Sequence, residues 1–532
     1  MHLLRIIVLS VALAVAASAS TARLGTVYCD AGGACAFKAG AADANGAAYG
    51  SWDDTIASQG WGSLKVYSNA SYPDAVQMYA AGMLEGALTA ERIADEYANV
   101  KYFYYQDAPV PANVTAFLAD QAAWTKAQAV AHADEPYWVY AGLLMAQLDG
   151  LTAGASAVNP ALDANVMLFL QATGDLLNLA NALKSPADRP DFAAMTNEEV
   201  ESFFYAASHC SGLFKVTPDL TDVFFGHSAW FEYAVTVRIA KFYSFPLSMT
   251  GYVGREMTFS SYAGFLESLD DFYLMSSGLV MVQTTNAIFN NDLLDLINST
   301  SMLSWQSVRI ANALATTGKQ WFELDAYLNA GTYSNQYMIL DTKLFTPGMP
   351  LQPNTFWVMD QIPGLSLGSD LTELLANGYY GSYNVPFHTT IWEMSGYGAM
   401  VKKTGSETYT YELAPRATIF RRNQTDVTDI ESMKAIMRYN DYKHDPLSNG
   451  NSMWAICSRG DLSASPNPGG CYDSKVAHLK DLDSLSMHFI SGPTRSSGLP
   501  AFKWTPEFSA MAKHVGIPEV FDFDFAHFTP KA

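Results

Sequence analysis

Apolar residues recur every three to four positions through most of the first third of the chain, which is the spacing of one helix face. This spacing predicts amphipathic helices over residues 75–88, 111–131 and 166–183, preceded by a short strand over residues 63–68. Residues 184–199 interrupt the pattern with prolines and charged side chains. We therefore expect a mostly helical first third that ends in an exposed connector.

The chain changes character at residue 210, where short apolar runs typical of β-strands replace the helical spacing. Residues 210–216 and 222–231 are two such runs around Thr-Pro-Asp-Leu at 217–220, a composition that favours a hairpin turn. The same patterns predict strands over 273–284, 335–343, 355–359 and 410–421, and helices over 305–316, 427–438 and 480–490. Blocks of helices and strands without a long polar linker predict one large α+β domain built in layers.

The predicted hairpin brings a thiol close to an imidazole. If the turn is centred between Pro218 and Asp219, Cys210 lies opposite His227, with the two Cβ atoms about 5 Å apart on one face. A turn shifted by one residue would move the partner to a neighbour. Since a thiol beside an imidazole is an arrangement that makes a thiolate, Cys210 is a candidate nucleophile, and the alternative is a buried, inert cysteine.

Composition narrows the classes of function. Apolar residues make up 49% of the chain and charged residues only 16%, which allows a large core. The formal net charge of −21 repels phosphate backbones, so we expect no nucleic-acid partner. Beyond the N-terminus no segment reaches the roughly 18 apolar residues of a membrane helix, so we expect no transmembrane segment.

The N-terminus has the pattern of a secretion signal. Arg5 precedes an apolar run over residues 6–17, and small residues follow, which predicts a signal peptide over residues 1–19. A secreted or lysosomal protein is therefore expected. The Asn-X-Ser/Thr sequons compatible with this route and with glycosylation are at Asn69, Asn113, Asn298 and Asn423.

Five cysteines in such a chain suggest two short disulfides and one free thiol. Cys29 and Cys35 lie in one loop-like stretch, and Cys457 and Cys471 bracket another, so these two pairs are expected to bond. Cys210 is left over. The ten histidines contain no H-E-x-x-H motif and the cysteines no C-x-x-C spacing, so no metal, zinc included, and no cofactor is expected.

A second candidate nucleophile is a serine. Gly-Leu-Ser-Leu-Gly at 364–368 fits the G-x-S-x-G elbow of lipases, with Ser366 as nucleophile and Asp445 and His478 or His488 downstream. Pro363 stands where the preceding strand should run, and no His-Gly-Gly-Gly segment is present. These features favour the thiol.

Ordered segments along most of the chain carry a family resemblance. They are Ala-Tyr-Gly-Ser-Trp-Asp-Asp (48–54), Gly-Trp-Gly-Ser-Leu-Lys-Val (60–66), Tyr-Ala-Ala-Gly-Met-Leu-Glu-Gly (79–86), His-Cys-Ser-Gly-Leu (209–213), Gly-His-Ser-Ala-Trp (226–230), Thr-Thr-Asn-Ala-Ile-Phe-Asn (284–290), Gln-Ile-Pro-Gly (361–364), Gly-Ser-Tyr-Asn-Val-Pro (381–386), Ala-Pro-Arg-Ala-Thr-Ile-Phe-Arg-Arg-Asn-Gln (414–424) and Met-Arg-Tyr-Asn-Asp-Tyr-Lys-His-Asp-Pro-Leu-Ser (437–448). Through them the chain resembles the phospholipase B-like (LAMA-like) family from residue 48 to about residue 508.

That family resembles the N-terminal-nucleophile hydrolases, such as penicillin V acylase and bile salt hydrolase, which have an αββα sandwich. The resemblance implies that the precursor is cut between His209 and Cys210 and that the fragments 20–209 and 210–532 stay together. Cys210 would then be both nucleophile and chain terminus. Its new α-amino group, which titrates near pH 7.7 to 8.0, would accept the thiol proton.

The resemblance also suggests roles for individual residues. His227 would orient or relay a proton, Asn384 would donate its amide to the oxyanion, and Arg416 would add positive charge. Trp230 falls where the family lines the nucleophile.

Thr284 and Thr285 would line the pocket. This chain has Ser228-Ala229 where the family usually has Asn-Thr, so a hydrogen bond from those positions is not expected to carry over. The activity implied is the release of fatty acyl chains from glycerophospholipids through a thioester, with peripheral contact to a lipid surface. The alternatives are an N-acyl amide hydrolase and a catalytically silent luminal glycoprotein.

Overall fold

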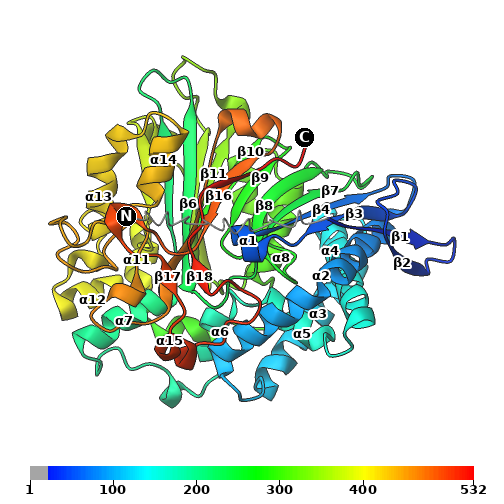
Figure 1. Ribbon diagram of the computed structural model, residues 1–532, viewed down its shortest axis with the longest axis horizontal. Coiled ribbons are helices and arrows are strands. Elements are labelled where there is room, and N and C mark those ends of the chain that lie inside the picture. The colour runs from blue at the N-terminus through cyan, green and yellow to red at the C-terminus, as the bar shows by residue number, and fades with distance from the viewer. Residues whose placement is uncertain (1–21, 532) are drawn as a thin grey trace, which may run out of the picture.

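Two β-sheets form the centre of the molecule in the computed structural model, which describes residues 22–531 (Figure 1). The signal peptide predicted for residues 1–19 lies outside the described residues. The larger sheet has eleven strands in the order β13-β12-β11-β10-β9-β8-β7-β4-β3-β1-β2, and the smaller has six in the order β14-β5-β6-β15-β16-β19. The protein combines helices with large sheets, which is the α+β class expected from the sequence.

The strands of the larger sheet are β1 (Arg23–Cys29), β2 (Cys35–Ala39), β3 (Ala48–Asp53), β4 (Gly62–Ser68), β7 (Arg238–Ser244), β8 (Glu256–Tyr262), β9 (Phe272–Met275), β10 (Leu279–Thr285), β11 (Asn335–Asp341), β12 (Phe356–Ile362) and β13 (Leu365–Asp370). Those of the smaller sheet are β5 (Ser211–Val216), β6 (Val223–Glu232), β14 (Tyr379–Ser382), β15 (Gly469–His478), β16 (Met487–Ser491) and β19 (Ala526–Phe528). A separate pair consists of β17 (Phe502–Lys503) and β18 (Val520–Phe521).

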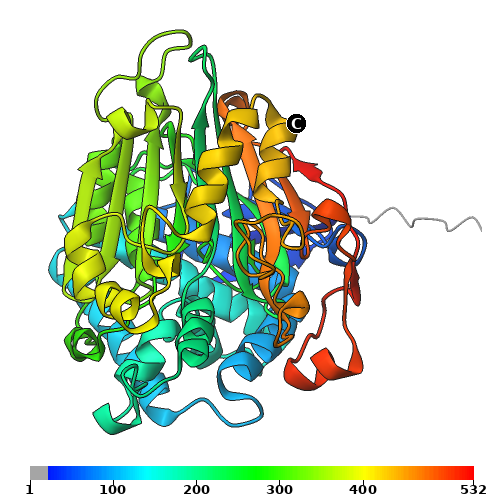
Figure 2. The same ribbon diagram turned by 90° about the vertical axis from the view of Figure 1, so that its left-hand side faces the viewer.

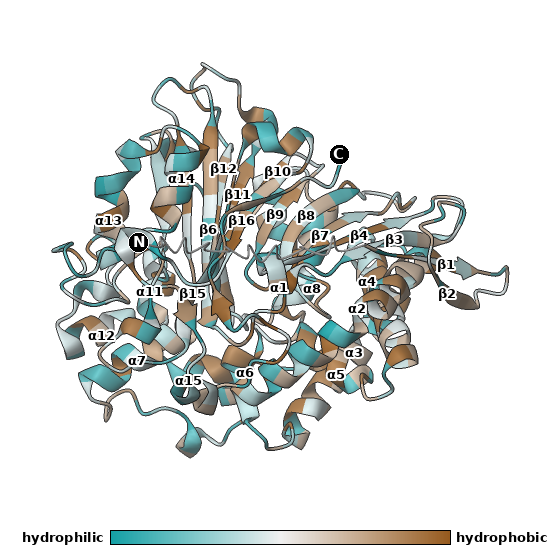
Figure 3. Ribbon diagram, in the orientation of Figure 1, coloured by the Kyte–Doolittle hydropathy of each residue, from teal (hydrophilic) through white to brown (hydrophobic). Residues whose placement is uncertain are grey.

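The two sheets pack face to face because alternate residues of their strands are apolar. Phe214 of β5 and Phe225 of β6 share one buried cluster with Val280 and Val282 of β10 and Met338 of β11. Figure 3 shows hydrophobic residues concentrated in strands of this interface, such as β11, β12 and β16. This core includes Phe214 of β5, the strand that begins directly after the predicted nucleophile, Cys210.

Helices cover the outer faces of both sheets (Figures 1 and 2). They are α1 (Ile56–Gln59), α2 (Asp74–Tyr105), α3 (Ala112–Ala131), α4 (Pro136–Val158), α5 (Ala164–Gln171), α6 (Leu176–Ala182), α7 (Asn197–Ala207), α8 (Ser304–Leu314), α9 (Gly318–Ala326), α10 (Thr372–Leu375), α11 (Thr389–Met394), α12 (Tyr397–Thr404), α13 (Pro415–Asn423), α14 (Ile430–Met437) and α15 (Pro506–Met511). Helices α2, α4 and α8 cover the larger sheet, and α14 covers β6 and β15 of the smaller one.

Helices α2 and α4 approach each other closely because both present glycine at their contact. A Cβ atom on Gly82 would lie 1.9 Å from the carbonyl oxygen of Gln147, and one on Gly150 would lie 1.9 Å from that of Tyr79. No side chain fits at such a separation, so glycine permits the contact.

No helix within residues 22–531 is long and apolar enough to cross a membrane.

The chain segments on either side of residue 210 share the larger sheet. Strands β1 to β4 come before that residue and β7 to β13 after it. They meet in the parallel pairing of β4 with β7, from Gly62 opposite Ile239 to Tyr67 opposite Ser244. The hydrogen bonds of this ladder hold the two segments together without using the peptide bond before Cys210.

Most of the predicted helices and strands are present, and several expectations were wrong. Residues 410–421 were expected to form a strand, but Pro415 begins α13, because proline fits the first turn of a helix. Residues 480–490 were expected to form a helix and instead contain a short turn followed by β16. The predicted strand 273–284 is the two strands β9 and β10, and the predicted helix 166–183 is divided into α5 and α6.

The cysteine pairing expected from the sequence is confirmed. Cys29 bonds to Cys35 and Cys457 to Cys471, and Cys210 is free and buried.

The predicted glycosylation asparagines all reach the surface. Asn113 and Asn298 are exposed, and Asn69 and Asn423 are partly exposed. Their positions are sterically compatible with glycosylation, which stays a prediction.

Candidate active site

The peptide bond between His209 and Cys210 joins helix α7 to strand β5 in the interior of the protein. Both side chains are buried. Cys210 has a φ angle of 83°, in the left-handed region that side chains other than glycine rarely adopt. Such a conformation costs on the order of 1–3 kcal/mol, so the surrounding contacts must hold this linkage in place.

Two N–H groups converge on the carbonyl oxygen of His209. The side-chain amide of Asn384 donates to it, and so does the backbone N–H of Thr285 at 2.9 Å. The His209 N–H in turn donates to the carbonyl oxygen of Thr285 at 3.3 Å. Paired N–H donors on one carbonyl oxygen are the arrangement that stabilises an oxyanion.

Arg416 fixes the orientation of that amide from helix α13. Its Nη2 donates to Asn384 Oδ1 at 2.5 Å, which leaves the amide nitrogen of Asn384 facing His209. Its Nη1 donates to the carbonyl oxygen of Cys210 at 2.7 Å and to Ser211 Oγ at 3.1 Å. The guanidinium carbon lies 4.2 Å from the ring centre of Trp230. The planar guanidinium therefore reaches both sides of the site at once.

Burial controls the charges around the thiol. It raises the pKa of Cys210 above its ordinary value, although a backbone hydrogen bond from Trp230 and the charge of Lys475 act in the opposite direction. Burial lowers the pKa of His209 to about 3 and that of Arg416 to about 10. In this structure the thiol is therefore protonated, and the nearby imidazole of His209 is neutral.

The structure corrects the predicted partner of Cys210. His227 lies opposite Gly212, not Cys210, because the turn of the β5–β6 hairpin is centred one residue later than expected. Leu220 adopts a left-handed conformation, and the Thr217 hydroxyl accepts the N–H groups of the last two loop residues. Moving the turn by one residue moves the partner of His227 by two, from Cys210 to Gly212, so the imidazole stays on the expected face of the hairpin. Neither of its ring nitrogens has a hydrogen-bond partner among the described residues.

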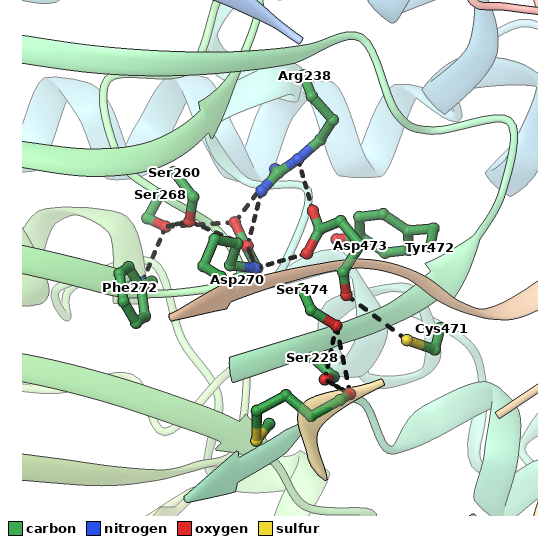
Figure 4. A network of polar contacts seen from close by, with 12 residues as sticks. Ser228, Arg238, Ser260, Ser268, Asp270, Phe272, Cys471, Tyr472, Asp473 and Ser474 are labelled. Atoms are coloured by element: carbon green, nitrogen blue, oxygen red, sulfur yellow. Dashed lines mark hydrogen bonds and ion pairs between the residues drawn. The ribbon is translucent and has the colours of Figure 1, made fainter. Parts of the chain in front are cut away.

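A buried ionic network behind the nucleophile was missed by the sequence reasoning (Figure 4). Arg238 bridges two carboxylates, with Nη2 2.8 Å from Asp270 and Nε 2.9 Å from Asp473. Lys475 contacts the same two carboxylates, at 2.8 Å for Asp473. Lys475 is also the cross-strand neighbour of His227 in the β6–β15 pairing.

This network explains two pKa shifts. Burial alone would raise the pKa of Asp270, but Arg238 and Lys475 outweigh it and hold that pKa below its ordinary value. Burial, together with the charge of Lys475, keeps the pKa of His227 well below its ordinary value, so that imidazole is neutral. No local motif marks the network, since its members come from β7, β15 and the turn before β9.

The predicted pocket residues contact the site in different ways. Trp230 donates its indole N–H to the carbonyl oxygen of Ile456 at 3.1 Å and supports Arg416 with its ring. Thr285 acts through its backbone. Thr284 forms a hydroxyl pair with Ser382 at 2.6 Å, between the two sheets.

A cleft of about 510 Å³ borders the site, and His209 is among its lining residues. Its lining includes Tyr205, His209, Trp230, Phe231 and Glu232. The His209 ring stands edge-on against Phe231, with centroids 4.8 Å apart. Beside the thiol itself the free space is about 10 Å³, which is about enough for one water. His209, Trp230 and Phe231 line both the cleft and this small space, so these three side chains separate the cleft from the sulfur.

The serine elbow considered as an alternative is absent. Ser366 lies within the edge strand β13, opposite Gln361, and not on a sharp turn from a strand to a helix. Asp445 forms an ion pair with Arg422 at 2.6 Å, and His478 bonds to a different aspartate. Cys210 stays the candidate nucleophile, as the sequence favoured.

A free thiol preceded by a carbonyl in an N–H cradle defines a candidate acyl-transfer centre of the cysteine type. The chain belongs to the phospholipase B family, whose model, described as Phospholipase B, matches residues 48–528. It is 44% identical over 502 residues to "Phospholipase B" of Crotalus adamanteus, which covers 92% of this chain and 89% of the relative.

Similar proteins are found in distant organisms. "Phospholipase B-like 1" of Rattus norvegicus is 42% identical over 498 residues, covering 92% of this chain and 88% of the relative. "Phospholipase B-like protein B" of Dictyostelium discoideum is 35% identical over 507 residues, covering 92% and 86%. The resemblance inferred from the sequence segments is thus confirmed over nearly the whole chain.

Proposed function

We propose that the protein is a phospholipase B-type hydrolase of the N-terminal-nucleophile class, with Cys210 as nucleophile. The single observation that supports this most is the seating of the His209 carbonyl oxygen between the Asn384 amide and the Thr285 N–H. The helix-sheet-sheet-helix layering also fits the αββα sandwich of that class. The names of the relatives support a lipid ester as the substrate.

Activation begins with the chain as its own substrate. The Cys210 sulfur attacks the His209 carbonyl carbon, and the oxygen takes up negative charge against Asn384 and Thr285. The C–N bond then breaks as the nitrogen takes up the proton that the thiol has lost, leaving His209 as a thioester and the nitrogen of Cys210 as a free amine. Water hydrolyses the thioester to the His209 carboxylate and a free thiol. The fragments 20–209 and 210–532 stay together through the shared sheet.

The mature reaction repeats this chemistry on a lipid. The new α-amine accepts the proton of the Cys210 thiol, and the thiolate attacks the carbonyl carbon of a fatty acyl ester. The alcohol portion leaves with a proton, and water releases the fatty acid from the thioester. Arg416 holds the Asn384 amide toward the oxyanion in both reactions. After the cut the His209 end moves out of the way, and the cleft beyond it receives the lipid.

We further propose a secreted or lysosomal location and contact with lipid surfaces. Two disulfides and surface sequons support the luminal route.

Expression of the wild type and Cys210→Ala tests the proposal. The wild type should yield two fragments on a denaturing gel, with terminal sequencing placing Cys210 first in the larger one. Only the cut protein should release fatty acid from phosphatidylcholine. A panel of N-acyl amides, assayed in parallel, tests the alternative substrate class. Cys210→Ala should remain uncut and inactive, while Ser366→Ala should behave as the wild type. Activity in uncut protein, or in Cys210→Ala, would overturn the mechanism.

A further inference from the structure

Two histidines face each other at the edge of the smaller sheet, away from the nucleophile. His488 of β16 and His527 of β19 are direct cross-strand partners. Their rings are nearly parallel, with centroids 4.3 Å apart and planes inclined by 16°. The Asp481 carboxylate, from the turn before β16, completes the group, with Oδ1 3.9 Å from His527 Nε2. One ligand atom from each of the three lies within 4.8 Å of the other two.

The surrounding contacts orient these groups without occupying them all. Asp481 Oδ2 accepts the backbone N–H of His478 at 3.0 Å, and Oδ1 accepts the Ser486 hydroxyl at 3.2 Å. His527 Nδ1 is 3.4 Å from the Thr529 hydroxyl, which leaves Nε2 for the carboxylate side. Such outer contacts are the kind that fix the orientation of metal ligands.

A lysine near the site already has a partner of its own. Lys434 lies close to His488, but its Nζ is held 2.7 Å from Glu431 Oε1. Within residues 22–531 the ring nitrogens of His488 make no hydrogen bond, so they have a lone pair to offer.

We propose that Asp481, His488 and His527 bind one Zn²⁺ ion, with water at the fourth position. Two imidazoles and one carboxylate form a donor set that zinc favours, with bonds of about 2.0–2.2 Å in a tetrahedron. Tetrahedral ligands at that bond length are about 3.3–3.5 Å apart. The three ligand atoms, now within 4.8 Å of one another, would therefore move closer by about 1 Å, and the stacked imidazole rings would turn so that their nitrogens point at the ion.

The ion would fasten the end of the sheet. Strand β19 is three residues long and lies at the edge of the smaller sheet, where β16 is its one paired neighbour among the described residues. A bond from His527 to the same ion as Asp481 and His488 ties this strand to its neighbour and to the preceding turn. This role is structural and independent of the reaction proposed for Cys210.

Zinc titration of the full chain in a calorimeter, with metal analysis after dialysis, tests the site. We expect one Zn²⁺ per chain and a melting temperature that rises with zinc concentration. His527→Ala removes an exposed side chain and should fold normally, yet weaken zinc binding more than about a hundredfold.

A matched control is His444→Ala. His444 is also exposed and paired with an aspartate, Asp441, at 2.8 Å, but belongs to no group of three ligands found among the described residues. It should leave the zinc affinity unchanged. Asp481→Asn provides a second test, with the same loss expected as for His527→Ala. No bound zinc, or equal binding by wild type and His527→Ala, would overturn the proposal. Since Cys210→Ala should bind zinc normally, the result is separate from the test of the reaction.

Discussion

Asn384 combines an unusual backbone conformation with a donor role. Its φ angle is 69°, a value that asparagine tolerates better than most residues. The conformation directs the amide toward His209, and Arg416 keeps it from rotating. The proposed oxyanion cradle therefore depends on a residue type that suits both the turn and the chemistry.

Removal of this amide should slow self-cleavage. We expect Asn384→Ala to reduce the rate about 10²–10³-fold, because one of two N–H donors to the developing oxyanion is lost. The fraction of cut chain over time on a denaturing gel measures the rate. Asn354→Ala is the control, because Asn354 has the same φ angle of 69° but lies on the exposed surface. Equal rates for the two variants would contradict the cradle.

Arg416 should not be replaceable by lysine. Its two terminal nitrogens contact different groups, Asn384 on one side and Cys210 with Ser211 on the other. One ammonium group cannot reproduce both, so Arg416→Lys should slow the cut about tenfold or more. Arg421→Lys, on the exposed face of the same helix, should cut at the wild-type rate. A wild-type rate for Arg416→Lys would show that its charge alone suffices.

At the scale of elements, the second disulfide lies directly behind the site. Cys457 and Cys471 pack against Trp230. The carbonyl oxygen of the preceding residue, Ile456, accepts hydrogen bonds from Trp230 at 3.1 Å and from the Ser211 hydroxyl at 2.9 Å. The bridge thus fixes a loop that holds the start of β5.

Loss of this bridge should affect both stability and cleavage. For a separation of 14 residues we expect Cys457→Ser/Cys471→Ser to lower the free energy of unfolding by about 3 kcal/mol. The cut should also become slower. Urea unfolding measures the loss of stability, and the fraction of cut chain on a denaturing gel measures the cutting rate. The pair Cys29→Ser/Cys35→Ser should leave the cutting rate unchanged, because that bridge joins β1 and β2 at the far edge of the larger sheet. A similar cutting rate in both double variants would contradict the link.

Sequence patterns predicted the elements better than their pairing. The apolar runs located β5 and β6. The pairing register of these two strands depends on the left-handed conformation of Leu220, which leucine has no local preference to adopt. The ionic network could not be predicted, because Arg238, Asp270 and Lys475 meet only when both sheets pack. Aromatic and β-branched residues suggested a strand at 410–421, whereas Pro415 and tertiary packing favour a helix. Asn384 and Arg416 were found through family resemblance, since their spacing alone gives no reason to join them.

At the scale of the whole molecule, buried acids make stability depend on pH. Burial raises the pKa of Glu96 from 4.5 to about 8 and that of Asp325 from 3.8 to about 8. Each group holds its proton in the folded protein and loses it in the unfolded chain over the intervening pH range. The folded state binds more protons there, so the free energy of unfolding falls as the pH rises.

We expect uncut Cys210→Ala protein to unfold at a lower urea concentration at pH 8 than at pH 5. Repulsion from the net charge of −21 acts in the same direction. Adding Glu96→Gln should reduce the difference between the two midpoints. Carboxylates with lowered pKa values, such as Asp445 at about 2, titrate below this range. His209 and His227, whose pKa values burial lowers, act in the opposite direction between pH 5 and the ordinary histidine pKa of 6.5, but not above it, where the buried acids continue to act. A midpoint that is unchanged or higher at pH 8 would contradict the expected role of the buried acids.

The filled passage beside Cys210 has a consequence for timing. If the chain is cut as proposed, the first product is a carboxylate on His209 that still occupies the place where a lipid must enter. Scission and readiness for a lipid are then separate events, and the second requires the retreat of a peptide end. Freshly divided protein should show a lag before it turns over lipid, and the lag should shorten when the end of the first fragment is trimmed away.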